Sequence, residues 1–111
     1  MRIDIIEKPI TRAEAKDIAK DLYEDMVKGV VDVEREMLAL GGEWHMDANV
    51  KLIKSGSKQC DVWGFNYYPD EHHIEFVSLI NIRPAQNNRK IEIQDETLRK
   101  RMDAIIRKLI V

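Results

Sequence analysis

Cysteine is nearly missing from this sequence, because Cys60 is the only one among 111 residues. The chain therefore forms no internal disulfide, which favours the reducing cytoplasm. Long apolar runs are missing as well, and none approaches the roughly 18–20 residues of a membrane span. Asp4 and Glu7 stand where a signal peptide would be apolar. We therefore expect a soluble, cytoplasmic protein without a membrane partner.

The sequence also lacks an excess of charge of one sign. The net charge is −2, so no overall field favours nucleic acid or an anionic membrane. The basic run 99–101 contains no aromatic residue and has acidic residues close by, which argues against nucleic acid as a partner. Residues 55–58 (Ser-Gly-Ser-Lys) lack the spacing of a P-loop, and no nucleophile elbow is present.

What the sequence does contain is the composition of a globular domain. With 44% hydrophobic and 34% charged residues, residues 1–111 fit one domain with its own core. Charge is unevenly spread: residues 12–40 carry five Lys/Arg against eight Asp/Glu, and residues 83–111 carry eight against four. Such opposed segments fit either solvated helix faces or surfaces for a protein partner.

The N-terminal residues predict an edge strand followed by a helix start. Residues 2–7 alternate between polar and apolar side chains before Pro9, which is typical of an edge strand. Thr11 and Glu14 have the spacing of a capping box, so we expect a helix to begin there.

This helix is predicted to be long, over residues 12–40. Gly41-Gly42 is expected to stop it in a left-handed conformation. Because it would be about 42 Å long, we expect it to bend near Gly29 or to pack on a second subunit. The apolar stripe that predicts it consists of Ala15, Ile18, Leu22, Met26, Val30, Val33, Met37 and Leu40.

Two short strands are predicted next. Residues 43–47 alternate, so that Glu43, His45 and Asp47 would share one side, with Trp44 and Met46 on the side of the core. Residues 50–54 are predicted as a strand that turns at 55–57. In the alternative, Asp47 caps a short helix that Gly56 closes.

We expect two long antiparallel strands within residues 61–83 to form the centre of the sheet. A turn over 69–72 sets Tyr68 opposite His73 and fixes which side chains share a face. Both faces contain apolar residues, so the second face needs a cover, either a helix or a subunit. The first face carries Trp63, Phe65, Tyr67, Ile74, Phe76, Ser78, Ile80 and Ile82; the second carries Val62, Gly64, Asn66, Tyr68, His73, Glu75, Val77, Leu79, Asn81 and Arg83.

The C-terminal part predicts a loop, a short strand and a helix. Residues 84–89 are rich in turn formers, and residues 90–93 are expected to add a short strand. Asp95 caps a final helix with an apolar side. The predicted fold class is therefore α+β, with an antiparallel sheet of four or five strands packed with a long N-terminal helix and a C-terminal helix.

One candidate site consists of Glu43, His45 and Asp47 together with Glu75. If the first three lie on one strand face, they share the polar side of the sheet with Glu75. A histidine among carboxylates can bind a divalent metal or act as an acid/base pair. The alternative is the charged outer face of an amphipathic strand, and the spacing matches no closed zinc pattern.

A second candidate site combines amides and guanidinium groups of the central strands and the following loop. Such groups can bind a carboxylate, a phosphate or a base edge. In the alternative, buried amides hold loops in place. The residues concerned are Asn66, Tyr68, Asn81, Arg83, Asn88 and Arg89.

Four segments resemble one family over nearly the whole chain: residues 41–47 (GGEWHMD), 56–59 (GSKQ), 63–69 (WGFNYYP) and 80–84 (INIRP). The family consists of small prokaryotic proteins catalogued as a domain of unknown function. Its pattern has Gly-Asn-Arg where this chain has Asn87-Asn88-Arg89. The resemblance implies a stand-alone cytoplasmic protein of a bacterium or archaeon, and it supplies no activity, substrate or cofactor.

Three functional hypotheses follow, and the sequence does not decide whether the protein is an enzyme. The first is a binding module that holds a small anionic ligand or a protein partner on the polar patch of one sheet face. The alternative is a metal- or acid/base-dependent hydrolase, and a further alternative is a structural or regulatory interaction domain. We expect a homodimer and no cofactor other than a divalent metal.

Overall fold

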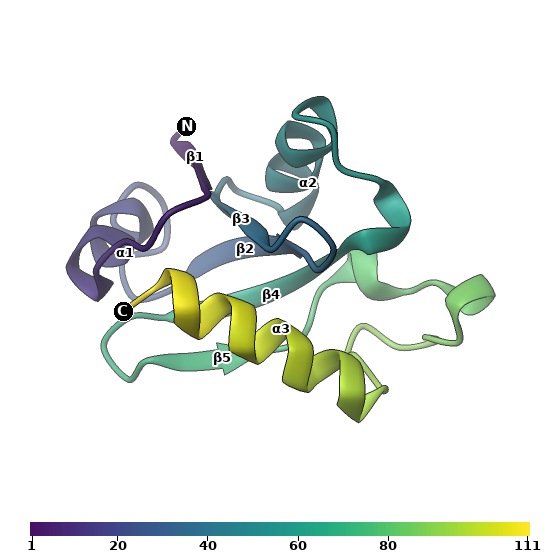
Figure 1. Ribbon diagram of the computed structural model, residues 1–111. Helices are drawn as coiled ribbons and strands as arrows, with labels where there is room; N and C mark the ends of the chain where they lie inside the picture. The colour runs from purple at the N-terminus through teal and green to yellow at the C-terminus, as the bar shows by residue number, and fades with distance from the viewer.

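A five-stranded antiparallel sheet forms the framework of the protein in the computed structural model, which describes residues 1–111 (Figure 1). Its strand order is β1-β3-β2-β4-β5, so the α+β class and the edge position predicted for the first strand are confirmed. The central strand is β2, not β4. The elements are β1 (Ile3–Ile6), α1 (Arg12–Ala19), β2 (Val27–Asp32), β3 (Met37–Gly41), α2 (His45–Lys54), β4 (Val62–Tyr68), β5 (His73–Glu75) and α3 (Glu96–Leu109), with short 3-10 turns η1 (Gln59–Asp61), η2 (Leu79–Asn81) and η3 (Pro84–Gln86).

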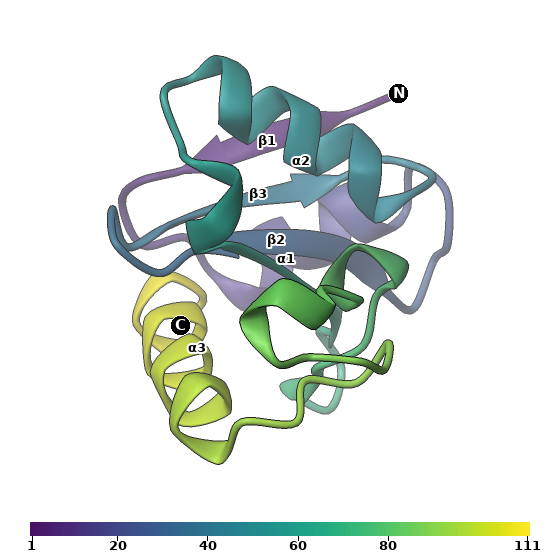
Figure 2. The same cartoon turned by 90° about the vertical axis from the view of Figure 1, so that its right-hand side faces the viewer.

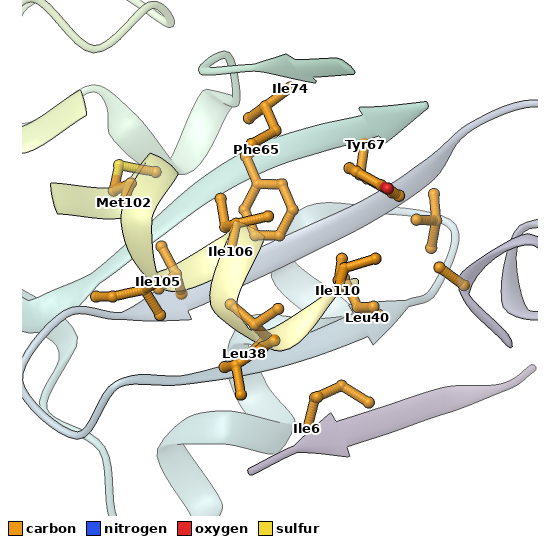
Figure 3. Packing of buried hydrophobic residues seen from close by; sticks show 14 of the residues in the cluster. Ile6, Leu38, Leu40, Phe65, Tyr67, Ile74, Met102, Ile105, Ile106 and Ile110 are labelled. Atoms are coloured by element: carbon orange, nitrogen blue, oxygen red, sulfur yellow. The ribbon is translucent and has the colours of Figure 1, made fainter. Parts of the chain in front are cut away.

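The larger part of the core lies on one face of the sheet, beneath α1 and α3. Nineteen buried residues form this cluster. Figure 3 shows Phe65 of β4 against Ile106 of α3, with Met102 and Ile105 beside them. The predicted apolar side of α3 is confirmed, and the Asp95 carboxylate caps the helix by accepting from the Thr97 N–H at 2.9 Å.

The opposite face is covered by α2. A smaller cluster of six buried residues joins this helix to β2, β3 and β4. Figure 2 shows α2 in front of the sheet and α1 behind it, with the segment that follows β5 (green) on the same side as α2. The prediction that a helix or a subunit covers this face is confirmed by a helix of the same chain. The apolar second face therefore no longer supports a homodimer, which stays a prediction.

The long helix predicted over residues 12–40 is wrong. The capping box at Thr11 is present, and the Glu14 N–H donates to Thr11 Oγ1 at 3.1 Å, but α1 ends at Ala19. Apolar residues continue at helical spacing beyond Ala19 by coincidence, because β2 and β3 place apolar residues on both faces of the sheet. Valines at 27, 30, 31 and 33 favour a strand, and the continuous apolar run 37–40 is typical of a strand buried on both faces.

One polar side chain and one glycine explain how the residues between 27 and 35 fold. Asp32 is buried, and its Oδ1 accepts from the N–H groups of Glu34 and Arg35 at 2.9 Å each. Gly29 lies within β2. A glycine is needed at this position because a Cβ there would stand 2.6 Å from Phe65 Cζ and 2.8 Å from Leu40 Cδ2. This glycine permits close packing and makes no helix bend.

The strands predicted at 43–47 and 50–54 are also wrong. A single helix, α2, begins at His45 and ends before Gly56, as the alternative stated. Asp47 occupies the third helical position and accepts from the Trp44 N–H at 2.9 Å. The orientation of the side chains is consequently reversed, with Trp44 exposed and His45 buried.

The predicted pairing of the two strands is correct up to Glu75, Phe76 still lies on the predicted core side, and the prediction fails beyond Phe76. Tyr68 pairs with His73 as expected, but β5 ends at Glu75 and the chain turns away. Ile80 therefore packs on the α2 side, and Ile82 is exposed. Residues 90–93 form no strand, although an isolated bridge joins Glu92 to Val77.

Candidate functional site

A cleft of about 530 Å³ opens on the α2 side of the sheet, where neither α2 nor η2 covers the strands. This volume lies in the range of small-molecule sites. The floor is formed by β2 and β4, one wall by the start of α2, and the other wall by the segment that follows β5. The lining residues are Lys28, Trp44, His45, Met46, Asn66, Val77, Ser78, Leu79, Ile80 and Ile91.

Lys28 and Asn66 lie directly opposite each other on the neighbouring strands β2 and β4, so their side chains share the floor of the cleft. The Lys28 ammonium forms no ion pair. It lies 5.4 Å from the centroid of the Tyr23 ring. Lys28 is half-buried, so the cleft contains one cation without a counter-ion.

Asn66 carries a polar atom that the protein leaves without a partner. Its Nδ2 donates to Glu75 Oε1 at 3.3 Å, which sets the orientation of the amide. The Asn66 side-chain oxygen Oδ1 is buried and accepts no hydrogen bond. Buried acceptors are nearly always paired, and an unpaired one costs about 1–3 kcal/mol.

His45 begins α2 and is 8% exposed. Its Nε2 lies 2.9 Å from the carbonyl oxygen of Phe65. Burial and the positive charge of Lys28 lower the pKa of His45, whereas the Phe65 carbonyl and the Asn66 side chain oppose this shift. The ring is therefore neutral in the empty cleft near pH 7.

The rim of the cleft is apolar and unusually open to solvent. Trp44 is 60% exposed, Met46 50%, Leu79 73% and Ile91 46%. The first turn of α2 also leaves the N–H groups of His45 and Met46 without an intrahelical acceptor, which favours negative charge nearby. The cleft thus combines an apolar rim with a floor that attracts an anion.

The wall after β5 is held by side chains that replace a missing strand. Beyond Glu75 the edge of β4 has no strand partner, and Asn81 takes this place: its Oδ1 accepts from the Gly64 N–H at 2.8 Å, and its Nδ2 donates to the Gly64 carbonyl at 3.0 Å. Arg83 continues the row by donating to the carbonyl of Val62. Its guanidinium also lies 4.2 Å from the centroid of the Trp63 ring.

Asn88 completes this support. It is buried, its Nδ2 donates to the Asn81 carbonyl at 2.7 Å, and its Oδ1 accepts from the Gln94 N–H at 2.8 Å. Asn87 adopts a left-handed φ of 61°, a conformation that glycine adopts freely and asparagine tolerates. Asn87 can therefore hold this turn without a glycine.

The six residues of the predicted ligand site do not share one surface. Asn66 lines the cleft, while Asn81, Arg83 and Asn88 direct their polar groups into the fold around it. Arg89 is exposed. Tyr68 donates to Glu75 Oε1 at 2.7 Å, and this hydrogen bond raises the pKa of Tyr68 to about 12.

The four residues of the predicted metal site are not brought together either. Because α2 begins at His45, the shared strand face of Glu43, His45 and Asp47 does not exist. Asp47 caps the helix, and Glu75 accepts from Asn66 and Tyr68. No three His, Cys, Asp or Glu side chains of the protein lie in an arrangement that could hold a metal ion.

Sequence reasoning missed Lys28 and most of the apolar lining. The helix predicted over residues 12–40 includes Lys28 and gives it no role in a site, and the strand predicted at 43–47 places Trp44 and Met46 on the side of the core. One available signal was the strand-forming composition around Lys28, which places a lone lysine inside a valine-rich strand. The exposure of Leu79 and Ile91 follows from the turn after Phe76, for which the sequence contains no proline or glycine signal.

Fold and cleft together define a small α+β protein with a ligand-sized apolar cleft. The chain belongs to the family described as "Protein of unknown function (DUF5674)", whose sequence model matches residues 4–109. This match confirms the resemblance noted from the sequence. Searches of curated proteins and of solved structures find no match.

No helix of the protein combines the length and the apolar character needed to cross a bilayer. The prokaryotic origin and the cytoplasmic location stay predictions.

Proposed function

We propose that the protein is a binding module for a small organic monoanion with an apolar body. The observation that carries this proposal is the unpaired Lys28 ammonium on the floor of a cleft whose rim is apolar. The apolar part of the ligand would pack between Trp44 and Leu79. The anionic group would lie against Lys28 and the first turn of α2.

The balance of charges supports a monoanion. Lys28 is the only side chain of the lining that carries a fixed charge, and six of the ten lining residues are hydrophobic. A dianion such as a phosphate monoester would leave one charge without a counter-charge against a mostly apolar lining, which is costly. A neutral apolar molecule would bury surface but would leave Lys28 without a counter-ion.

The test is calorimetric titration with decanoate and with its neutral analogue 1-decanol. Lys28→Met keeps the apolar stem and removes the charge. We expect it to weaken decanoate binding about tenfold, or ~1.4 kcal/mol, while 1-decanol binding stays the same. Lys58→Met is the matched control, because Lys58 is exposed and does not line the cleft.

Two results would contradict this proposal. One is a native protein that does not bind decanoate at concentrations below its micelle-forming range. The other is an equal effect of Lys28→Met and Lys58→Met, which would show that the charge at the floor of the cleft is irrelevant.

A second candidate function is docking of an apolar segment of a protein partner, including a second copy of this chain. The exposure of Trp44 and Leu79 favours it, because large apolar side chains clustered at a rim often mark interfaces. Size-exclusion chromatography with light scattering tests the homodimer. A 13.0 kDa particle at micromolar concentration would contradict it.

A further inference from the structure

The hydrogen bond to Phe65 fixes which nitrogen of His45 can gain a proton. A backbone carbonyl only accepts, so the Nε2 that lies 2.9 Å from the Phe65 oxygen must carry its hydrogen. This holds for the neutral and for the charged ring. The proton that distinguishes the two forms is therefore bound at Nδ1.

Asn66 supplies the cleft with an acceptor that lacks a donor. The Asn66 oxygen is buried and accepts no hydrogen bond within the protein. Asn66 and His45 line the same cleft, and the Asn66 side chain raises the pKa of His45, which favours the imidazolium form. Because Asn66 Nδ2 is directed to Glu75, the amide cannot turn its donor side to the ring without losing that bond.

The charged groups around His45 explain why the ring is neutral in the empty cleft. From β2, Lys28 opposes a second positive charge. From β5, Glu75 is separated from the ring by Asn66, and residues 77–80 contribute no ionisable side chain. On its own segment, Glu43 is exposed, and the Asp47 carboxylate accepts from the Trp44 N–H.

We propose that the cleft binds an apolar carboxylate together with one proton, which His45 takes up from solvent at Nδ1. The carboxylate compensates the charge of Lys28, and the imidazolium then donates to the Phe65 carbonyl and to the free oxygen of Asn66. This inference rests on the proposed function, because it needs an anion beside Lys28. It names the ligand class as carboxylic acids with an apolar chain or ring.

Linkage determines the sign and size of the effect. A ligand that raises the pKa of His45 binds the protonated protein more tightly by the same factor, about tenfold for each pKa unit. Decanoate affinity is therefore expected to increase as the pH falls from 8 to 6. The ligand itself stays ionised over this range, because a carboxyl group titrates near about 4.3.

The experiment is calorimetric titration of the full chain with decanoate at pH 6.5, in two buffers with different ionisation enthalpies. The observed enthalpy should change with the buffer, which reports net proton uptake. His45→Gln retains an amide donor toward Phe65 but cannot be protonated, so its decanoate affinity should not change with pH. His73→Gln is the matched control and should keep the uptake, since His73 is exposed and outside the cleft.

A second measurement uses the native protein and does not depend on a variant that folds. NMR titration of the His45 ring with and without decanoate should show a higher pKa in the complex. Decanoate binding with a buffer-independent enthalpy, or an unchanged His45 titration in the complex, would overturn proton uptake and leave the proposed function intact. Absence of decanoate binding would overturn both.

Discussion

The two faces of the sheet are covered in different ways. Beneath α1 and α3, nineteen buried residues pack together, and none of them is charged. Beneath α2 the buried cluster has six residues, and next to it Lys28 and Asn66 lie on an open floor. One face therefore supplies most of the stability, whereas the incomplete cover of the other creates a cleft with unsatisfied polar groups.

The largest expected difference between the faces comes from truncating apolar side chains. Phe65 is fully buried under α3, so Phe65→Ala should lower the free energy of unfolding by about 3–5 kcal/mol. Leu79 is 73% exposed at the rim, so Leu79→Ala should change it by less than about 0.5 kcal/mol but weaken decanoate binding. Urea denaturation measures both. Comparable losses would contradict the division between a core face and a site face.

Two asparagines on the α2 side sharpen the comparison. Asn81→Leu would leave the Gly64 N–H and carbonyl unpaired, and we expect a loss of about 2–4 kcal/mol. Asn66→Leu removes an acceptor that is already unpaired and one 3.3 Å hydrogen bond to Glu75, whose Oε1 still accepts from Tyr68, so the free energy of unfolding should stay within about 0.5 kcal/mol. Urea denaturation measures the free energy of unfolding of both variants. An equal loss of this free energy in the two variants would mean that Asn66 has a structural role.

The smallest effect concerns the dependence of stability on pH. The pKa of His45 is lowered in the folded protein, so the unfolded chain binds the proton more readily. The stability that the neutral His45 ring contributes to the folded protein is complete above the unfolded pKa of about 6.5. It is lost as the pH falls below this value toward and through the folded pKa. His45→Gln should reduce the loss of stability between pH 7 and pH 5, whereas His73→Gln should not. Urea denaturation at both pH values measures the slope, and equal slopes in the native protein and His45→Gln would be inconsistent with a buried neutral ring.

Local signals in the sequence were sufficient for several elements. The capping box at Thr11, the turn that sets Tyr68 opposite His73, and the α3 helix capped by Asp95 all depend on residues close in the chain. The partition of β4 into an aromatic core side and a mixed side was correct as well. Each of these features follows from short-range spacing, which an isolated sequence contains.

The remaining errors arose where tertiary contacts decide. Residues 27–40 satisfy both a helical stripe and a two-sided strand pattern, and the valine-rich composition favours the strand, which the pairing of β2 with β4 then stabilises. Trp44 looked like a core residue because its exposure depends on the helix that Asp47 caps. The sequence identifies Asn66 as a candidate ligand-binding residue. It does not identify Lys28, because the two residues become neighbours only when β2 pairs with β4.

The central claim is that the α2-side cleft is a ligand site, and the two tryptophans test it directly. Trp44 lies at the rim, whereas Trp63 is 4% exposed in the core beneath the opposite cover. In an NMR titration with decanoate, the indole N–H signal of Trp44 and the backbone signals of Lys28 and Asn66 should shift together and saturate. The Trp63 indole signal should stay in place. Saturable shifts that appear along α3 and leave Trp44 unchanged would contradict the account.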